Sequence, residues 1–319
     1  MSDPVETTDL RRSFGGRTAL DGVTLSVREG EIFGLLGPNG GGKTTLFRIL
    51  CTLLPPSGGR ARVCGHDTVA AAAAVRASIG VVFQSPSLDP QLTVAENLRY
   101  GGNLYGLRGA ELEARWREMA VALRVDDRAG DMVKNLSGGL QRRVEIAKSL
   151  LPRPRVLLLD EPSTGLDPVA RVDLWAILEQ LRVRFGITTV LTTHLMDEAE
   201  RCGRVGILHL GKLLACDSPD ALRATIGADV LTLVCRRPDA VAERLQAEFG
   251  WTAVVRDDAV RVEIPKAHAE VARIVEAFPG EIQSVTAGRP TLEDVFVRMT
   301  GERLGVPFFE DGKKNKKKK

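Results

Sequence analysis

The sequence lacks the long apolar segments of a membrane-spanning protein. Its longest unbroken apolar run, Val69–Val75, has seven residues and is mostly alanine, whereas a membrane-spanning helix needs about 20. The first ten residues also lack the basic and apolar segments of a secretory signal. We therefore expect a cytoplasmic protein whose work at any membrane goes through a partner.

Metal-binding and disulfide patterns are scarce as well. The five cysteines form no C-x-x-C pair and the four histidines show no H-E-x-x-H spacing, so we expect free thiols in a reducing compartment. With 44% hydrophobic and 27% charged residues, the composition excludes a disordered or fibrous protein.

The net charge of +3 is concentrated at one end of the chain. Six lysines lie within residues 313–319, so the rest of the chain carries 3 − 6 = −3. This mildly acidic body argues against a nucleic-acid protein built around a basic face. For the lysine-rich end three interpretations stay open: a solvated unfolded tail, attraction to anionic lipid and contact with nucleic acid.

Residues 1–218 predict an α/β fold with a parallel sheet core, because short β-branched runs alternate with helical stretches. The core strands are apolar without alternation, which indicates burial on both faces. They are expected at Glu31–Leu36, Val81–Phe83, Val156–Asp160 and Thr188–Thr192. A helical insertion is expected at about residues 85–150. Its helical pattern covers Thr93–Leu123 and Asp126–Met132, with interruptions at Gly101-Gly102 and Gly106.

After a linker near Asp217–Asp220, residues 219–301 predict a small α+β domain. The order is strand, helix, two strands, helix and strand, which is ferredoxin-like, and a last helix follows over Leu292–Met299. The first five expected elements are Val230–Cys235, Ala240–Phe249, a hairpin of Thr252–Val255 and Val260–Ile264 around Asp257-Asp258, and His268–Phe278. The final strand is Glu281–Thr286, and residues 302–319 are expected to be a flexible lysine-rich tail.

A phosphate-binding loop is indicated by Gly37-x-x-x-x-Gly42-Lys43-Thr44, which follows a predicted strand and opens a helix from Thr45. Glycines let successive main-chain N–H groups turn toward an oxyanion, and the helix N-terminus adds partial positive charge. Lys43 brings a full charge to the β- and γ-phosphates, and the Thr44 hydroxyl can ligate Mg²⁺.

Two carboxylates follow the apolar strand that ends at Asp160. Asp160 is placed to hold Mg²⁺ through water, and Glu161 can polarise an attacking water as general base. Together with the phosphate-binding loop, this pair predicts a nucleoside triphosphatase.

A second anion-binding helix end is predicted at Ser137-Gly138-Gly139, before the helix Leu140–Leu151. One chain needs only one such end for one γ-phosphate. The second end therefore suggests a nucleotide that is held by another copy of the chain.

In these motifs residues 5–218 resemble the nucleotide-binding subunits of ABC transporters. The resemblance implies that two copies close head to tail over two ATP·Mg²⁺ and drive a separately encoded integral membrane permease at the inner face of the cell membrane. It implies nucleotide contacts for Gly37, Pro38, Asn39, Gly40, Gly41, Gly42, Lys43, Thr44 and Thr45. It implies Mg²⁺ contacts for Thr44, Gln84 and Asp160.

The same resemblance implies roles for residues outside the phosphate loop. Phe14 would stack on adenine, Gln84 would contact Mg²⁺ or the attacking water, and His194 would contact the γ-phosphate beside Glu161. Ser137, Gly138 and Gly139 would clamp the γ-phosphate of the opposing subunit, and Asp167 would bridge the two sites. The alternatives are an ordinary packed aromatic for Phe14, a structural histidine for His194 and a helix cap for Asp167.

One position departs from the family pattern, since Leu140 stands where the usual signature has glutamine. With Arg142-Arg143 and the segment Thr291–Phe296 (TLEDVF), the chain resembles the daunorubicin-resistance-type exporters to about residue 301. The alternative is a soluble, non-transport ABC ATPase that acts on ribosomes or nucleic acid. One phosphate loop and the lack of a heptad run favour transport.

Overall fold

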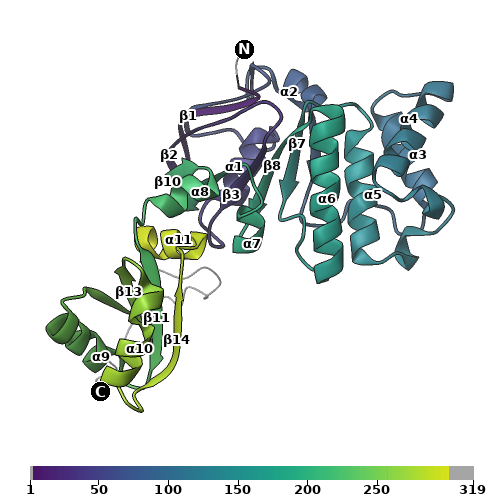
Figure 1. Cartoon of the computed structure of the whole chain (residues 1–319). Helices are drawn as coiled ribbons and strands as arrows, with labels where there is room; N and C mark the ends of the chain where they lie inside the picture. The colour runs from purple at the N-terminus through teal and green to yellow at the C-terminus, as the bar shows by residue number, and fades with distance from the viewer. Residues whose placement is uncertain (1–2, 257, 302–319) are drawn as a thin grey trace, which may run out of the picture.

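The computed structural model describes residues 3–256 and 258–301 (Figure 1). A six-stranded sheet of order β10-β9-β3-β8-β7-β6 forms its centre. All neighbouring strands are parallel except β9 and β10. The strands are β3 (Ile32–Leu36), β6 (Ile79–Val82), β7 (Val156–Asp160), β8 (Thr188–Thr193), β9 (Arg204–His209) and β10 (Lys212–Asp217).

Every residue of β3, β7 and β8 is buried, which confirms the expectation that these strands are covered on both faces. Strand β6 begins two residues earlier than predicted and ends before Phe83. Beyond that end the main-chain carbonyl of Phe83 accepts a hydrogen bond from Arg142 instead of a strand partner.

A second, antiparallel sheet of order β2-β1-β4-β5 was not expected from the sequence. Its strands are β1 (Val5–Phe14), β2 (Arg17–Val27), β4 (Gly58–Val63) and β5 (His66–Asp67). Its apolar side chains share a buried cluster with α1 (Lys43–Leu50). The turn between β1 and β2 brings Phe14 beside the loop that precedes α1.

The helical insertion contains α3 (Val94–Leu104), α4 (Gly109–Ala122) and α5 (Gly138–Leu150), which pack side by side (Figure 1). The predicted break at Gly101-Gly102 is wrong, because both glycines lie within α3. A Cβ on Gly101 would lie 2.9 Å from Lys148, and one on Gly102 would lie 2.3 Å from Leu112. These glycines therefore permit close helix packing, and the chain breaks only around Gly106.

The predicted helix at Asp126–Met132 is also wrong beyond one 3₁₀ turn at Asp126–Arg128. The carbonyls of Ala129 and Asp131 accept hydrogen bonds from the first main-chain N–H groups of α3. Because these carbonyls accept hydrogen bonds from α3, they do not accept the hydrogen bonds that would continue a helix in their own segment. Among the described residues, no helix is both long and apolar enough to cross a membrane.

Of the remaining helices of this part of the chain, one leads from β5 of the antiparallel sheet to β6, and two connect strands of the central sheet. They are α2 (Ala72–Ser78), α6 (Pro168–Phe185) and α7 (Met196–Ala199).

The C-terminal sheet has the order β12-β13-β11-β14, with every neighbouring pair antiparallel. Its elements are β11 (Asp229–Cys235), α9 (Pro238–Arg244) with a π-helical turn at Leu245–Phe249, β12 (Ala253–Arg256), β13 (Ala259–Ile264), α10 (Ala267–Ala277) and β14 (Ile282–Gly288). This confirms the ferredoxin-like order. Residue 257 of the predicted turn and the predicted tail 302–319 lie outside the described residues.

The last helix, α11 (Leu292–Thr300), packs on the central part of the chain beside α8 (Pro219–Ala224). Its residues Leu292, Val295 and Phe296 belong to the apolar cluster of the insertion and central sheet, whereas the C-terminal sheet has a cluster of its own. The limits of the C-terminal domain, residues 219–301, stay a prediction. Helix α11 attaches this part of the chain to the central part.

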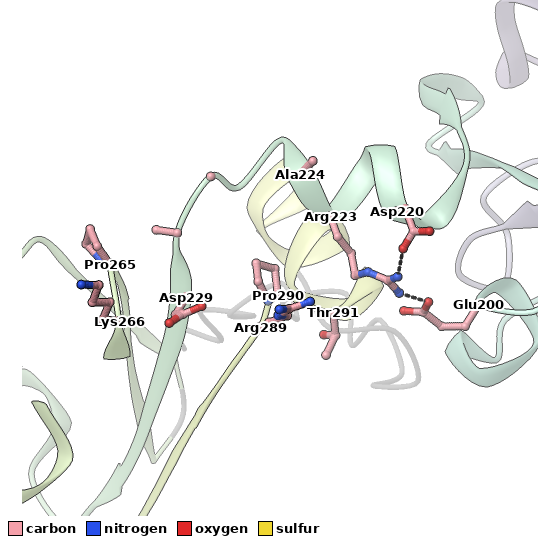
Figure 2. A pocket seen from close by; sticks show the side chains of 12 residues that line it. Glu200, Asp220, Arg223, Ala224, Asp229, Pro265, Lys266, Arg289, Pro290 and Thr291 are labelled. Carbon is pink, nitrogen blue, oxygen red and sulfur yellow. Dashed lines mark hydrogen bonds and ion pairs between the residues drawn. The ribbon is translucent and has the colours of Figure 1, made fainter. Parts of the chain in front are cut away.

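A cavity of about 730 Å³ marks this junction (Figure 2). Beside it Arg223 of α8 forms ion pairs with Asp220 and with Glu200, which follows α7. Glu200 also accepts a hydrogen bond from the main-chain N–H of Leu292 at 3.3 Å. The C-terminal part is thus fastened to the segment that follows β8.

Candidate active site

The phosphate loop connects β3 to α1, and its glycines lie where side chains do not fit. A Cβ on Gly37 would lie 2.1 Å from the carbonyl oxygen of Leu208, and one on Gly42 would lie 2.7 Å from that of Ala19. Gly42 has φ 110° and caps α1, so the helix begins at Lys43, two residues before the predicted start. The loop is therefore held against β2 and β9 by its backbone.

Lys43 is buried and lies inside this loop. Its Nζ donates to the carbonyls of Gly37 at 2.7 Å and Pro38 at 3.0 Å, and it lies 3.9 Å from Oε1 of Glu161. Burial lowers the pKa of Lys43, while the charges of Glu161 and Asp160 oppose that change. The ammonium is thus positioned at the loop with a carboxylate close by.

A cavity of about 370 Å³ opens at the loop. Its lining consists of Phe14, Arg17, Ala19, Pro38, Asn39, Gly40, Gly42, Lys43, Thr44 and Thr45. Phe14 is 45% exposed, so its ring is available to a ligand, and the guanidinium of Arg12 lies 4.5 Å from the ring centre. An aromatic ring beside a phosphate loop and a lysine fits a nucleotide.

The two carboxylates at the end of β7 differ in environment. Asp160 is buried, and its Oδ1 accepts a 2.6 Å hydrogen bond from the hydroxyl of Thr192. Burial raises the pKa of Asp160, against the opposing effect of that hydrogen bond. Glu161 has a left-handed backbone with φ 47°, which is uncommon for a residue other than glycine.

The side chain of Glu161 is the meeting point of three predicted site residues. The Nε2 of Gln84 donates to Oε2 at 3.2 Å, and Nδ1 of His194 lies 3.2 Å from Oε1. With Lys43 on the other side, residues 43, 84 and 194 converge on one carboxylate from three separate segments. The hydroxyl of Thr164, which the sequence analysis missed, also donates to Oε2 at 3.2 Å.

The predicted signature residues lie in a different place. Ser137 caps α5 by accepting from the N–H of Leu140, and Ser137 and Gly138 are exposed. A Cβ on Gly139 would lie 2.8 Å from Ala170 of α6. Asp167 caps α6 by accepting from Ala170 at 2.9 Å. The structure therefore places the signature residues beside the start of α6, and Asp167 makes the helix cap that was the alternative to its predicted bridging role.

Comparison with known proteins identifies this arrangement. The ABC transporter family profile matches residues 20–164. The chain is 37% identical over 310 residues to the daunorubicin resistance ATP-binding protein DrrA3 of Streptomyces coeruleorubidus, which covers 95% of this chain and 98% of that protein. The chain belongs to the ABC transporter ATP-binding proteins.

Two further similarities agree with this identification. The ABC protein is 38% identical over 305 residues to the Nod factor export ATP-binding protein I of Paraburkholderia xenovorans strain LB400, covering 94% of this chain and 98% of that one. A solved ATP-binding cassette, dimeric in a post-hydrolysis state with ADP and Pi, superposes with a TM-score of 0.60 at 29% identity. The match covers 67% of this chain and 98% of the solved chain. The ABC protein is thus an ATPase of the drug-resistance and export type.

In this ABC ATPase the signature helix α5 is fastened to the Gln84 segment. Arg142 donates to the carbonyls of Phe83 at 2.8 Å and Gln84 at 3.3 Å, and it pairs with Glu145 at 2.7 Å. Glu145 in turn accepts from the N–H of Ser87 at 2.6 Å. These contacts hold the main chain of Gln84 against α5.

Leu140 stands where the family signature has glutamine. The glutamine at the next position, Gln141, makes contacts of its own and does not take that place. The amide of Gln141 donates to the carbonyls of Val133 at 3.1 Å and Leu136 at 3.0 Å. Gln141 therefore supports the loop before α5. Ser137 and Gly138 remain as the exposed groups of this helix end.

Proposed function

We propose that two copies of this ATPase close head to tail over two ATP·Mg²⁺ and drive a separately encoded membrane permease to export its cargo. One observation carries the proposal. Lys43, Gln84 and His194 converge on Glu161, while Ser137 and Gly138 stay exposed beside α6. A helix end that binds anions well and has no part in its own chain's phosphate site is suited to a nucleotide held by a second copy.

The hydrolytic step is in-line phosphoryl transfer, which depends mainly on positioning and charge neutralisation. Main-chain N–H groups of the phosphate loop and Lys43 bind the β- and γ-phosphates. Glu161 orients the attacking water and accepts its proton. Gln84 and His194 hold the Glu161 carboxylate in place on the γ-phosphate side of the site. Phe14 stacks on the adenine.

The predicted Mg²⁺ ligands offer the oxygen donors that suit a hard cation. Thr44, Gln84 and Asp160 would hold the Mg²⁺, and it would neutralise charge on the β- and γ-phosphates. Thr44 is exposed at the cavity, whereas Asp160 is buried.

Closure of the dimer couples this site to transport. Because ATP binds the closed dimer better than the open one, it shifts the equilibrium of an attached permease. Cleavage of the β–γ linkage then weakens the clamp made by Ser137, Gly138 and Gly139, and the dimer reopens. Asp167, next to the signature residues, would connect the two sites.

The relatives support the proposed location at the membrane and the proposed direction of transport. Proteins named for drug resistance and for export favour an export ATPase attached to a permease at the inner face of the cell membrane. They favour this over a non-transport ATPase that acts on ribosomes or nucleic acid.

Mixing two inactive variants tests the shared site. Ser137→Arg disables the clamp and Lys43→Ala disables the phosphate loop, so each alone should lose hydrolysis. An equimolar mixture should regain activity, because half of the mixed dimers' sites are intact. Absence of any rescue, with both variants folded by circular dichroism, would contradict a composite site.

Purification from solubilised membranes tests the partner. A tagged chain should carry a polytopic membrane protein with it in about equal amount. Recovery with ribosomes or nucleic acid, and not with a membrane protein, would support the alternative class.

A further inference from the structure

Thr192, the next-to-last residue of β8, contacts both acidic residues of the site, Asp160 and Glu161. It is fully buried and stands opposite Asp160 in the parallel pairing of β7 with β8. Its Oγ1 donates to Oδ1 of Asp160 at 2.6 Å and accepts from the main-chain N–H of Glu161 at 2.9 Å. One hydroxyl therefore contacts both the last residue of β7 and the residue that follows it.

The contact with Glu161 falls where the backbone is unfavourable. Glu161 adopts φ 47°, a conformation that costs free energy and persists only where surrounding contacts impose it. The N–H of Glu161 is part of this bend, and Thr192 is its hydrogen-bond partner. The bend directs the Glu161 side chain toward Gln84 and His194, while the Asp160 carboxylate stays buried with its Oδ1 bonded to Thr192.

We propose that Thr192 is a positioning residue for ATP hydrolysis, whose hydroxyl fixes the main chain of Glu161 and one oxygen of Asp160 at the same time. This inference rests on the proposed roles of the two carboxylates. The hydroxyl uses its single proton on Asp160 and a lone pair on Glu161, so both contacts are lost together when it is removed. The two adjacent carboxylates then lose their fixed, different orientations.

The neighbouring threonines show that this role belongs to one position. The Thr193 hydroxyl donates to Glu198 and accepts from the N–H of Leu195, so it serves α7. Thr189, on the same strand and equally buried, has a hydroxyl with no hydrogen-bond partner within residues 3–256 and 258–301. Thr189 is therefore a matched control for removal of a buried hydroxyl from β8.

The test compares Thr192→Val, Thr192→Ser and Thr189→Val in the full-length protein. Thr192→Val keeps the side-chain shape and should lower kcat by about 10- to 100-fold, since a misplaced catalytic group costs rates of that order. The KM for ATP should stay within about twofold, because the phosphate loop is untouched. Thr192→Ser should restore kcat to within about threefold, and Thr189→Val should match the parent protein.

A binding measurement separates positioning from general damage. By calorimetry, the affinity for ATP in the presence of Mg²⁺ should be within about twofold of the parent for Thr192→Val, whereas general damage to the site would weaken it. Thermal unfolding shows which variants are folded, and Thr192→Ala replaces Thr192→Val if the latter is not. Parent-like kcat in the hydroxyl-free variant, or equal losses in Thr192→Val and Thr189→Val, would overturn the proposal.

Failure of this inference differs from failure of the proposed function. If Glu161→Gln loses hydrolysis while Thr192→Val retains it, only the role of Thr192 is wrong. If Glu161→Gln itself hydrolyses ATP at the parent rate, the assignment of Glu161 is wrong as well.

Discussion

The hydroxyl of Ser163 donates a hydrogen bond to the buried carboxylate of Glu198, 35 residues further along the chain. The other oxygen of that carboxylate accepts from the hydroxyl of Thr193. Ser163 follows Glu161 by two residues, and Thr193 precedes His194. Glu198 therefore connects the segment that carries Glu161 to the segment that carries His194, which supports the 3.2 Å approach of His194 to Glu161.

Replacement of Glu161 by glutamine should abolish hydrolysis while ATP still binds. The shape is kept and Gln84 retains an oxygen to donate to, but the base is lost, which costs about 10²–10⁴ in rate. We expect a dimer trapped with ATP, visible by light scattering after gel filtration. Glu179→Gln, at an exposed ion pair of α6, is the control and should turn over normally. Brisk turnover by Glu161→Gln would remove Glu161 as the base.

Breaking the buried pair Arg142–Glu145 should strongly destabilise the protein. Glu145→Gln leaves a buried guanidinium without its counter-ion and should cost about 3 kcal/mol. The double variant Arg142→Met/Glu145→Leu should recover much of that loss, because it removes both charges. Denaturant unfolding of the three proteins measures this. Equal stability of Glu145→Gln and the parent would show that the pair contributes little.

Acid should weaken the contact between α3 and α4. The guanidinium of Arg99 bonds to Glu113 at 2.6 and 3.0 Å and lowers the pKa of that carboxyl to about 2. A carboxyl with a lowered folded-state pKa stabilises the fold above its ordinary value of 4.5 and loses that contribution as the pH falls toward 2. Thermal unfolding of Glu113→Gln should therefore start below the parent at pH 7 and converge with it between pH 4.5 and 2.

The control for this pH effect is Glu111→Gln, since Glu111 lies 3.9 Å from Arg115 and is 65% exposed. Its unfolding curve should follow the parent at every pH. A constant offset between Glu113→Gln and the parent down to pH 2 would mean that the ion pair is not the cause.

Truncation of Phe296 should destabilise the central part of the chain and not only the C-terminal sheet. Phe296 is fully buried in the cluster that also contains residues of the helical insertion, and Phe→Ala in such a site costs about 3–5 kcal/mol. Met299→Ala on the same helix, where 38% of the residue is exposed, should have a much smaller effect. Hydrogen exchange should show faster exchange in β8 and α7 of Phe296→Ala. Faster exchange confined to β11–β14 would contradict this attachment.

Local patterns were enough to predict the central strands and the phosphate loop. A strand buried on both faces is an unbroken apolar run, so β7 was predicted with its observed limits. The antiparallel sheet was missed because β1 carries exposed polar residues and three register irregularities against β2, which disturb the alternation that marks a half-buried strand. Gly101 and Gly102 were predicted to interrupt a helix, but they lie within α3. The residue type alone does not distinguish a glycine that ends a helix from one that lets two helices pack closely.

The sequence by itself determined the phosphate chemistry of this protein, because a loop that binds phosphate through its own main chain needs glycines, a lysine and a helix start within eight consecutive positions. Only the tertiary structure decided how Glu161 is held. Gln84 lies about a hundred residues away in the chain from the segment that carries Thr192 and His194. Both segments reach Glu161 because β6, β7 and β8 are neighbours in one sheet. Strand pairing is a long-range property, and no local pattern in the sequence encodes which side chains it brings within hydrogen-bonding distance.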